Sequence, residues 1–252
     1  MMLPDKLWSA DACYVLFEAA ELKAELRERL FSEHGEFLRP LLIHPDLWEL
    51  TNLGPWLWLC HERSLPLLES VIEQGVVQGV IRSQRTLDEL QQQFAMGCMV
   101  LEPKQRHSLL LRFYTSSALP IMLSQRTLPW YSSLFGGLSD WWCYQCDGQW
   151  THYSIEVEPS ELRVITLTED LQGALLGDPD LPRLLVMWQG SVRYQQFPAC
   201  ARMNMVQKAL QKSDTAGAPS ADRLIWGLAW LEGGSAALEE LKKPRSTGSL
   251  NA

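Results

Sequence analysis

The sequence has no apolar run long enough to span a membrane, and Met1 to Trp8 lack the basic and then apolar pattern of a signal peptide. It also has no cluster of Lys and Arg outside its last residues, and its net charge is −8. This balance argues against a nucleic-acid partner, because phosphate binding needs clustered basic side chains. We therefore expect a cytoplasmic protein that neither inserts into a membrane nor binds nucleic acid.

Motifs that carry catalytic chemistry are also missing. The chain contains no nucleophile elbow, P-loop, dinucleotide fingerprint or metalloprotease motif. Its single CxxC, Cys143 to Cys146, falls in a strand-like run, where residues three apart point to opposite faces. Cys60 precedes His61, but catalytic partners are usually distant in sequence. We expect no enzyme and no catalytic, cofactor or metal site; an unrecognised site around His61 or the CxxC is the alternative.

The apolar content and its patterning predict a folded α+β protein. Hydrophobic residues make up 46% of the chain, enough for a sizeable core, and the six cysteines lack framework spacing and are expected as reduced core residues. Strand-like and helical patterns alternate in the first half, which ends in a hairpin signal at Asp147-Gly148. The predicted class is α/β (α+β): a mixed β-sheet lobe flanked by helices over residues 1–155. A smaller, mostly helical lobe (156–243) and a disordered tail (244–252) follow.

Residues 76–114 hold the most informative pattern. A strand-like run, 76–82, leads into a helix start at which Thr86 and Glu89 have capping-box spacing. Two further strand-like runs, 98–101 and 108–114, follow the helix. The predicted order is therefore strand, helix and hairpin, with Arg82 and Arg112 near strand ends. A second capping box is predicted at Thr166 and Glu169.

This segment resembles the adaptor family of type VI secretion effectors, known as Tap or TEC chaperones. The resemblance rests on Gly79-Val80-Ile81-Arg82-Ser83, Leu87-Asp88-Glu89-Leu90, Leu111-Arg112-Phe113-Tyr114 with Ala118-Leu119, and Leu134-Phe135-Gly136. It covers residues 12–155. The sequence departs from the family at Gln78, where Trp is common, and at Thr115-Ser116-Ser117, which replace an Asp-Pro-Arg element.

The resemblance implies a function without chemistry. Such an adaptor binds one toxic effector in the cytoplasm of the producing bacterium and helps load it onto the VgrG spike. The implied partners are thus an effector protein and VgrG. An immunity protein that neutralises a cognate toxin is the alternative among binding proteins.

Five residues are candidates for partner binding. Arg82 and Arg112 follow apolar runs and could anchor a carboxylate or carbonyl of a partner, with an ion pair inside the chain as the alternative. Tyr114 shares the motif of Arg112. The chain has 11 Trp residues, and Trp226 and Trp230 lie opposite the Leu-rich side of the helix predicted at residues 221–231. They are expected either at a partner surface or between the two lobes, where we place the effector site.

Overall fold

The computed structural model describes residues 12–104, 107–145, 149–197 and 199–242. The chain divides into two compact units, Met1–Leu175 and Leu176–Ala252. Residues 156–175, which the sequence assigns to the second lobe, lie in the first unit. The tail 244–252, predicted to be disordered, lies outside the described residues, as does the turn at Asp147-Gly148.

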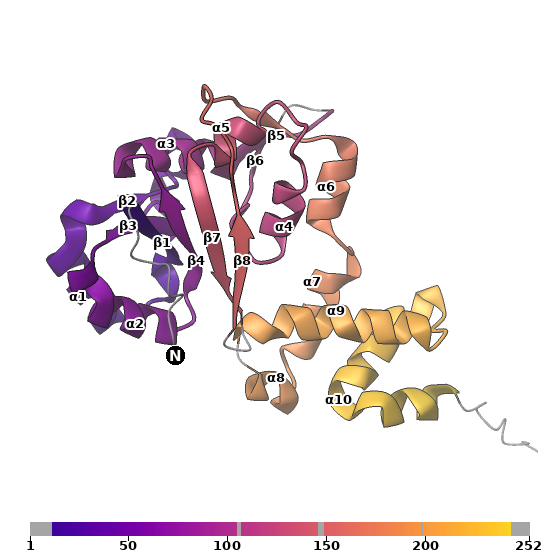
Figure 1. The fold of residues 1–252 in the computed structure, drawn as a ribbon. Coiled ribbons are helices and arrows are strands. Elements are labelled where there is room, and N and C mark those ends of the chain that lie inside the picture. The colour runs from indigo at the N-terminus through magenta and orange to yellow at the C-terminus, as the bar shows by residue number, and fades with distance from the viewer. Residues whose placement is uncertain (1–11, 105–106, 146–148, 198, 243–252) are drawn as a thin grey trace, which may run out of the picture. The chain divides into compact units, whose positions relative to one another are not determined.

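The first unit is built on a six-stranded sheet with the order β2-β3-β1-β4-β7-β8 (Figure 1). Its strands are β1 (Ala12–Glu18), β2 (Leu38–Pro40), β3 (Pro55–Cys60), β4 (Val77–Ser83), β7 (Leu138–Tyr144) and β8 (Trp150–Ser154). Every pair in this sheet is antiparallel. The predicted hairpin is β7–β8, in which Trp142 pairs with His152. The α+β class is confirmed.

A second, three-stranded sheet has the order β6-β5-β9. It consists of β5 (Met99–Leu101), β6 (Ser108–Leu110) and β9 (Ile165–Thr166). β5 pairs antiparallel with β6 and parallel with β9, so this small sheet has the mixed pairing. β6 is shorter than the predicted strand 108–114, because Phe113 and Tyr114 turn into the core instead of continuing the ladder.

Helices cover both faces of the six-stranded sheet (Figure 1). They are α1 (Ala24–His34), α2 (Leu65–Glu73), α3 (Leu87–Cys98), α4 (Ala118–Leu123), α5 (Tyr131–Phe135) and α6 (Glu169–Leu176). The central strand β1 is buried on both sides: Val15 and Phe17 pack in the core under α1 and α2, while Tyr14 and Leu16 pack in the core under α3, α4 and α5. Burial on both faces explains the continuous apolar run of β1.

Two predicted helix starts need correction. The spacing of Leu22, Leu26 and Leu30 predicts a helix over residues 18–30, but α1 begins only at Ala24, because the backbone N–H of Glu18 donates to the carbonyl of Val76 and keeps Glu18 in the sheet. The second capping box is also displaced. Thr166 lies in β9, and the hydroxyl of Thr168 accepts the hydrogen bond from the backbone N–H of Leu171. The box at Thr86 and Glu89 is confirmed.

Hydrogen bonds join the motif segments of the first unit to one another. The hydroxyl of Ser83, at the end of β4, donates to the carbonyl of Gly137 at 2.8 Å. The buried amide of Gln93 in α3 donates to the carbonyls of Leu134 at 2.7 Å and Gly136 at 3.2 Å. The strand, helix and Leu134-Phe135-Gly136 motifs therefore meet at one junction, which orients α3 against the sheet.

The second unit is helical in its described part. It contains α7 (Asp180–Trp188), α8 (Val192–Gln196), α9 (Ala199–Thr215) and α10 (Arg223–Lys242), and a kink at Gly234 interrupts α10. Its core comprises Leu184, Trp188, Val206, Ala209, Leu210 and Leu231. Throughout the described ranges, no helix is long and apolar enough to cross a membrane.

Candidate partner-binding site

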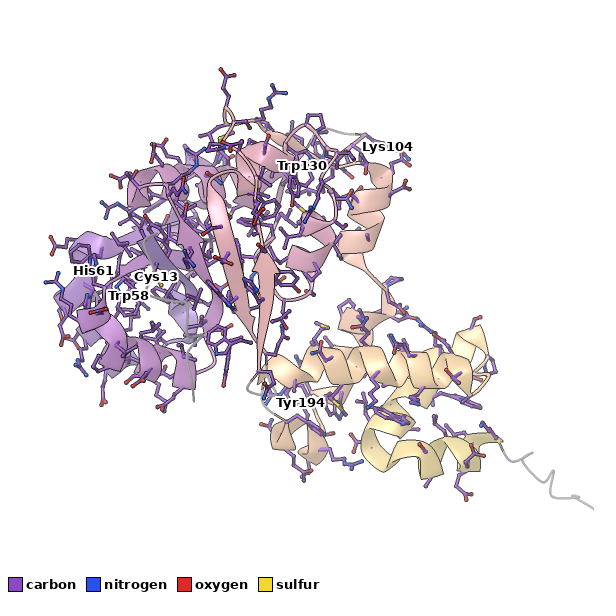
Figure 2. All side chains as sticks on the ribbon, viewed as in Figure 1. Cys13, Trp58, His61, Lys104, Trp130 and Tyr194 are labelled. Atoms are coloured by element: carbon purple, nitrogen blue, oxygen red, sulfur yellow. The ribbon has the colours of Figure 1, made fainter. Side chains whose placement is uncertain are left out.

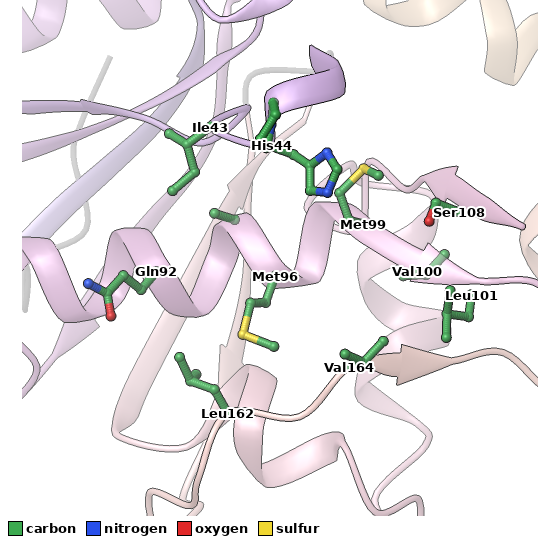
Figure 3. A pocket seen from close by; sticks show the side chains of 12 residues that line it. Ile43, His44, Gln92, Met96, Met99, Val100, Leu101, Ser108, Leu162 and Val164 are labelled. Carbon is green, nitrogen blue, oxygen red and sulfur yellow. The ribbon is translucent and has the colours of Figure 1, made fainter. Parts of the chain in front are cut away.

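An apolar groove opens on the first unit over α3 and the small sheet (Figure 3). Its volume is about 590 Å³. The lining residues come from the segment after β2, from α3, from β5 and β6, and from the segment before β9: Ile43, His44, Pro45, Gln92, Ala95, Met96, Met99, Val100, Leu101, Ser108, Leu162 and Val164. Most of the lining is therefore aliphatic or thioether.

The floor of the groove is the outer side of α3. Ala95 and Met96 lie three and four residues after Gln92, so these three share one side of α3, and Met99, the first residue of β5, continues the lining beyond the end of the helix. A second row on the same helix, Leu90, Phe94 and Cys98, is fully buried against the sheet. α3 is thus apolar on two sides, and its own unit covers one of them completely.

Two exposed segments form the walls. Ile43 stands on one side with 47% of its surface exposed, and Leu162 and Val164 stand on the other with 40% and 57% exposed (Figure 3). The polar side chains in the lining are His44, Gln92 and Ser108. Among the described residues, no carboxylate or thiol belongs to this lining. The groove is therefore suited to binding apolar side chains and has no set of groups for acid–base or nucleophilic chemistry.

Arg82 lies in β4 and makes an ion pair inside the chain. Its Nη1 atom is 3.2 Å from Oδ2 of Asp140 in β7, and both side chains are less than one-fifth exposed. The other oxygen of Asp140 is 2.6 Å from Nε2 of His152, whose ring stacks on Trp142. The ion pair of Arg82 therefore links the side chains of the neighbouring strands β4 and β7.

Arg112 and Tyr114 both meet Glu18 at the end of β1. Nη2 of Arg112 lies 2.5 Å from the Glu18 carboxylate, and the Tyr114 hydroxyl donates to the same oxygen at 3.0 Å. Tyr114 is buried, and its burial raises the pKa of its hydroxyl. The negative charge of Glu18 nearby raises that pKa further. Half of the Arg112 side chain remains exposed.

The ion pair inside the chain, one of the two alternatives for Arg82 and Arg112, is thus present for both. Contact of Arg82, Arg112 or Tyr114 with a partner stays a prediction. The structure places none of the three in the lining of the apolar groove.

Trp226 and Trp230 have different surroundings in α10. The side of α10 closest to α7 is centred on Gly227, where an added Cβ would lie 2.6 Å from Leu184. Trp230 packs against the core of the second unit, and Nζ of Lys208 is 5.9 Å from the centre of its ring. Trp226 is half-buried and, among the described residues, does not belong to the core cluster of the second unit. Their role toward a partner stays a prediction.

The cysteine and histidine alternatives find little support in the geometry. Cys13, Cys60, Cys98 and Cys143 are buried and unbridged (Figure 2 labels Cys13). Burial raises the pKa of Cys60 well above its ordinary value and that of Cys143 to about 12, which opposes the thiolate that a nucleophile or metal ligand needs. The side chain of His61 packs on Phe37. Cys146 lies outside the described residues, so the divergence of the CxxC stays a prediction.

No group of His, Cys, Asp and Glu in the described part of the chain could hold a metal ion. The expectations that the protein binds no zinc and is not an enzyme stay predictions as well.

Sequence reasoning missed the groove, although part of its signal was visible. Ala95, Met96 and Met99 repeat at helical spacing beside the row that packs on the sheet, which predicts a helix with two apolar sides. The walls carry no comparable signal, because residues 43–44 and 162–164 belong to irregular segments far from α3 in sequence.

The fold and the groove define an α+β domain with a surface for apolar ligands, and one comparison with known proteins agrees with the motifs. Residues 13–132 match a family model described as "Domain of unknown function (DUF4123)". This family is associated with type VI secretion effectors. The match includes the motifs at 79–83, 87–90 and 111–114, while Leu134-Phe135-Gly136 lies just beyond it. No curated protein and no solved structure matches the chain.

Proposed function

We propose that this protein is an adaptor that binds one type VI secretion effector in the cytoplasm and helps load it onto the VgrG spike. The observation that carries the proposal is the match to DUF4123 on the same residues that hold the adaptor-like motifs. These residues include α3, which forms the floor of the apolar groove. An adaptor needs a surface that covers apolar parts of its cargo, and the groove supplies one.

The chemistry of the groove favours binding over catalysis. In the described part of the chain, its lining brings together aliphatic and thioether groups with three polar side chains and presents no buried acid, base or nucleophile in a productive arrangement. In such a protein the effector is bound in the producing cell and released to the spike without a covalent step. The spike then carries the effector, and the adaptor stays behind.

A gene deletion in the native host tests this function. We expect loss of delivery of one effector, measured by competitive killing of a sensitive neighbour, while secretion of the tube protein continues. Continued secretion shows that the machine itself is intact. Delivery of every effector at the wild-type level would overturn the proposal.

The same strain separates the adaptor from an immunity protein. An immunity protein protects the cell that makes it, so its loss would make the deletion strain sensitive to its own siblings. An adaptor gives no such protection, and its loss makes the strain less harmful to others. Sibling killing of the deletion strain would therefore favour the immunity function.

A further inference from the structure

We propose that the groove over α3 binds one amphipathic helix of the effector, with apolar side chains of that helix on Ala95, Met96 and Met99 and basic residues at its flanks. The inference rests on the proposed function for the identity of the partner. It adds the surface of this chain that makes the contact and the chemistry of the segment that is recognised.

The backbone around the groove favours a helix over an added strand. A strand is recognised mainly through backbone hydrogen bonds to the free edge of a sheet. β5, the strand that contributes most to the lining, pairs with β6 across Met99, Val100 and Leu101, and Val100 and Leu101 also pair with β9 on the other side. The floor itself is a row of side chains on a helix. The groove therefore offers side-chain contacts, which suit an occupant that satisfies its own backbone hydrogen bonds.

The side chains of the floor suit the apolar face of such a helix. Residues at helical spacing form ridges and grooves into which the side chains of a second helix can pack. Met96 and Met99 have unbranched, polarisable side chains that adapt to irregular apolar surfaces. The exposed Ile43, Leu162 and Val164 flank this row and would enclose the inserted side chains (Figure 3).

The charges next to the walls favour basic flanks on the occupant. Asp46 follows Pro45 and lies 3.6 Å from Nδ1 of His44, Glu102 follows Leu101 and Glu161 precedes Leu162, so three carboxylates neighbour lining residues in the sequence. Arg163 opposes them, whereas the charge of Lys104 is partnered by Glu169 at 3.3 Å. The excess of negative charge agrees with the net charge of −8 for the chain. Complementary charge raises the association rate and selects among partners.

A labelled model peptide tests the chemistry of the groove directly. The probe is a fluorescein-labelled helical peptide of about five turns, roughly 18 residues, with Leu along one side and Lys along its flanks, mixed with the full-length protein. We expect saturable binding by fluorescence anisotropy, and at least about tenfold weaker binding to a Met96→Asp variant. Met187→Asp is the matched control, because Met187 lies in the second unit, is 42% exposed and should leave the affinity unchanged.

Two further peptides separate the apolar from the electrostatic part. Replacing Leu by Ser should abolish binding, and replacing Lys by Glu should weaken it. No binding of the first peptide, or equal binding to the Met96→Asp protein, would overturn the inference. Equal binding of the Glu peptide would overturn the part that concerns basic flanks. Met96→Gln, a milder change, replaces Met96→Asp if circular dichroism shows that the charged variant unfolds.

A second copy of this chain is the competing occupant. Sedimentation velocity of the wild-type protein and of Met96→Asp distinguishes it. A concentration-dependent dimer that Met96→Asp dissociates would assign the groove to self-association and overturn the effector assignment. A monomer, or a dimer unaffected by the change, supports the groove as a site for another partner.

Complementation in the native host separates this inference from the proposed function. We expect Met187→Asp, and not Met96→Asp, to restore delivery in the deletion strain. If deletion abolishes delivery and Met96→Asp restores it, the groove inference fails and the adaptor function stands. If deletion affects no effector, the adaptor function and the effector assignment fail, while the peptide experiment still decides whether the groove binds a basic amphipathic helix.

Discussion

Nη2 of Arg112 lies 2.5 Å from the carboxylate of Glu18, although the two residues are far apart in the chain. Glu18 ends the central strand β1 and its side chain is 8% exposed, so its charge has little access to water. Tyr114 donates to the same carboxylate. The motif that contains Arg112 and Tyr114 therefore fixes the segment after β6 to the end of strand β1, and this role inside the chain is independent of any partner.

Replacing Arg112 by Ala should destabilise the first unit. The change leaves a buried carboxylate with the Tyr114 hydroxyl as its remaining side-chain hydrogen-bond partner. Breaking a buried pair costs several kcal/mol, and the half-exposed Arg112 reduces this to about 1–3 kcal/mol. Urea unfolding at pH 7 measures the loss. Arg29→Ala is the control: its pair with Glu33 is exposed, and we expect a change below about 0.5 kcal/mol. Equal effects of the two substitutions would contradict the structural role of Arg112.

Gly79 permits Trp141 to lie across β4. A Cβ at Gly79 would collide with the indole ring of Trp141, which is fully buried. We expect Gly79→Ala to cost about 1–3 kcal/mol, as overpacking does in other cores. Gly173→Ala is the matched control, because Gly173 lies in α6 with open space around it and should be neutral or stabilising by up to about 1 kcal/mol. Thermal unfolding of the two variants gives the comparison; a Gly79→Ala protein as stable as wild type would show that the ring can move.

Local patterns predict the parts of this fold that local chemistry determines. The capping box at Thr86 fixes the start of α3 because its two hydrogen bonds lie within four residues. The hairpin β7–β8 follows from alternating residues around Asp147-Gly148. The strand predicted through Tyr114 is wrong for a tertiary reason: the ring of Phe113 packs on Phe94 and Trp141, which draws this segment away from the ladder.

The candidate site could be predicted even less completely than the fold. A helix row such as Ala95, Met96 and Met99 is readable in the sequence, because its spacing is local. Whether another part of the same chain covers that row depends on where residues 43–44 and 162–164 come to lie, and these irregular segments carry no periodic signal of their position. The groove therefore became visible with the tertiary structure.

Arg223 should make the stability of the second unit sensitive to acid. It bonds Asp178 at 2.6 Å and Asp214 at 2.7 Å, which joins the start of α10 to the segment before α7 and to α9. These hydrogen bonds from Arg223 lower the pKa of both carboxyl groups below the ordinary 3.8. The unfolded chain then binds more protons near pH 4, so this contribution is present above that pH and is lost as the pH falls toward the lowered values.

An Arg223→Gln variant tests the sign of that dependence. Hydrogen exchange of α9 and α10 in the full-length protein should show weaker protection at pH 7, by about 1–2 kcal/mol, since the carboxylates are partly exposed. Between pH 5 and 3 the difference from wild type should shrink, because the unfolded chain takes up protons on these carboxyl groups while Arg223 keeps those of the folded wild type ionised, and this uptake offsets the stability that Arg223 adds. Arg183→Gln, which removes a more exposed pair with Asp180, is the control. A difference that grows on acidification would contradict the assignment.

Trp226 and Trp230 should respond differently to the same substitution. Trp230→Ala removes a ring that packs on the core of the second unit and should weaken protection of α9 and α10 by about 1–3 kcal/mol, less than a fully buried Trp. Trp226→Ala should cost under about 1 kcal/mol, because this half-buried side chain, among the described residues, lies outside that cluster.

If Trp226 contacts the effector, its loss should weaken binding by about 2 kcal/mol without altering protection of α9 and α10 from hydrogen exchange. Hydrogen exchange of each single variant, paired with calorimetry against the effector whose delivery depends on this protein, separates the two roles. Equal losses of protection in both variants would refute the distinction, and unchanged affinity in Trp226→Ala would remove Trp226 from the partner surface.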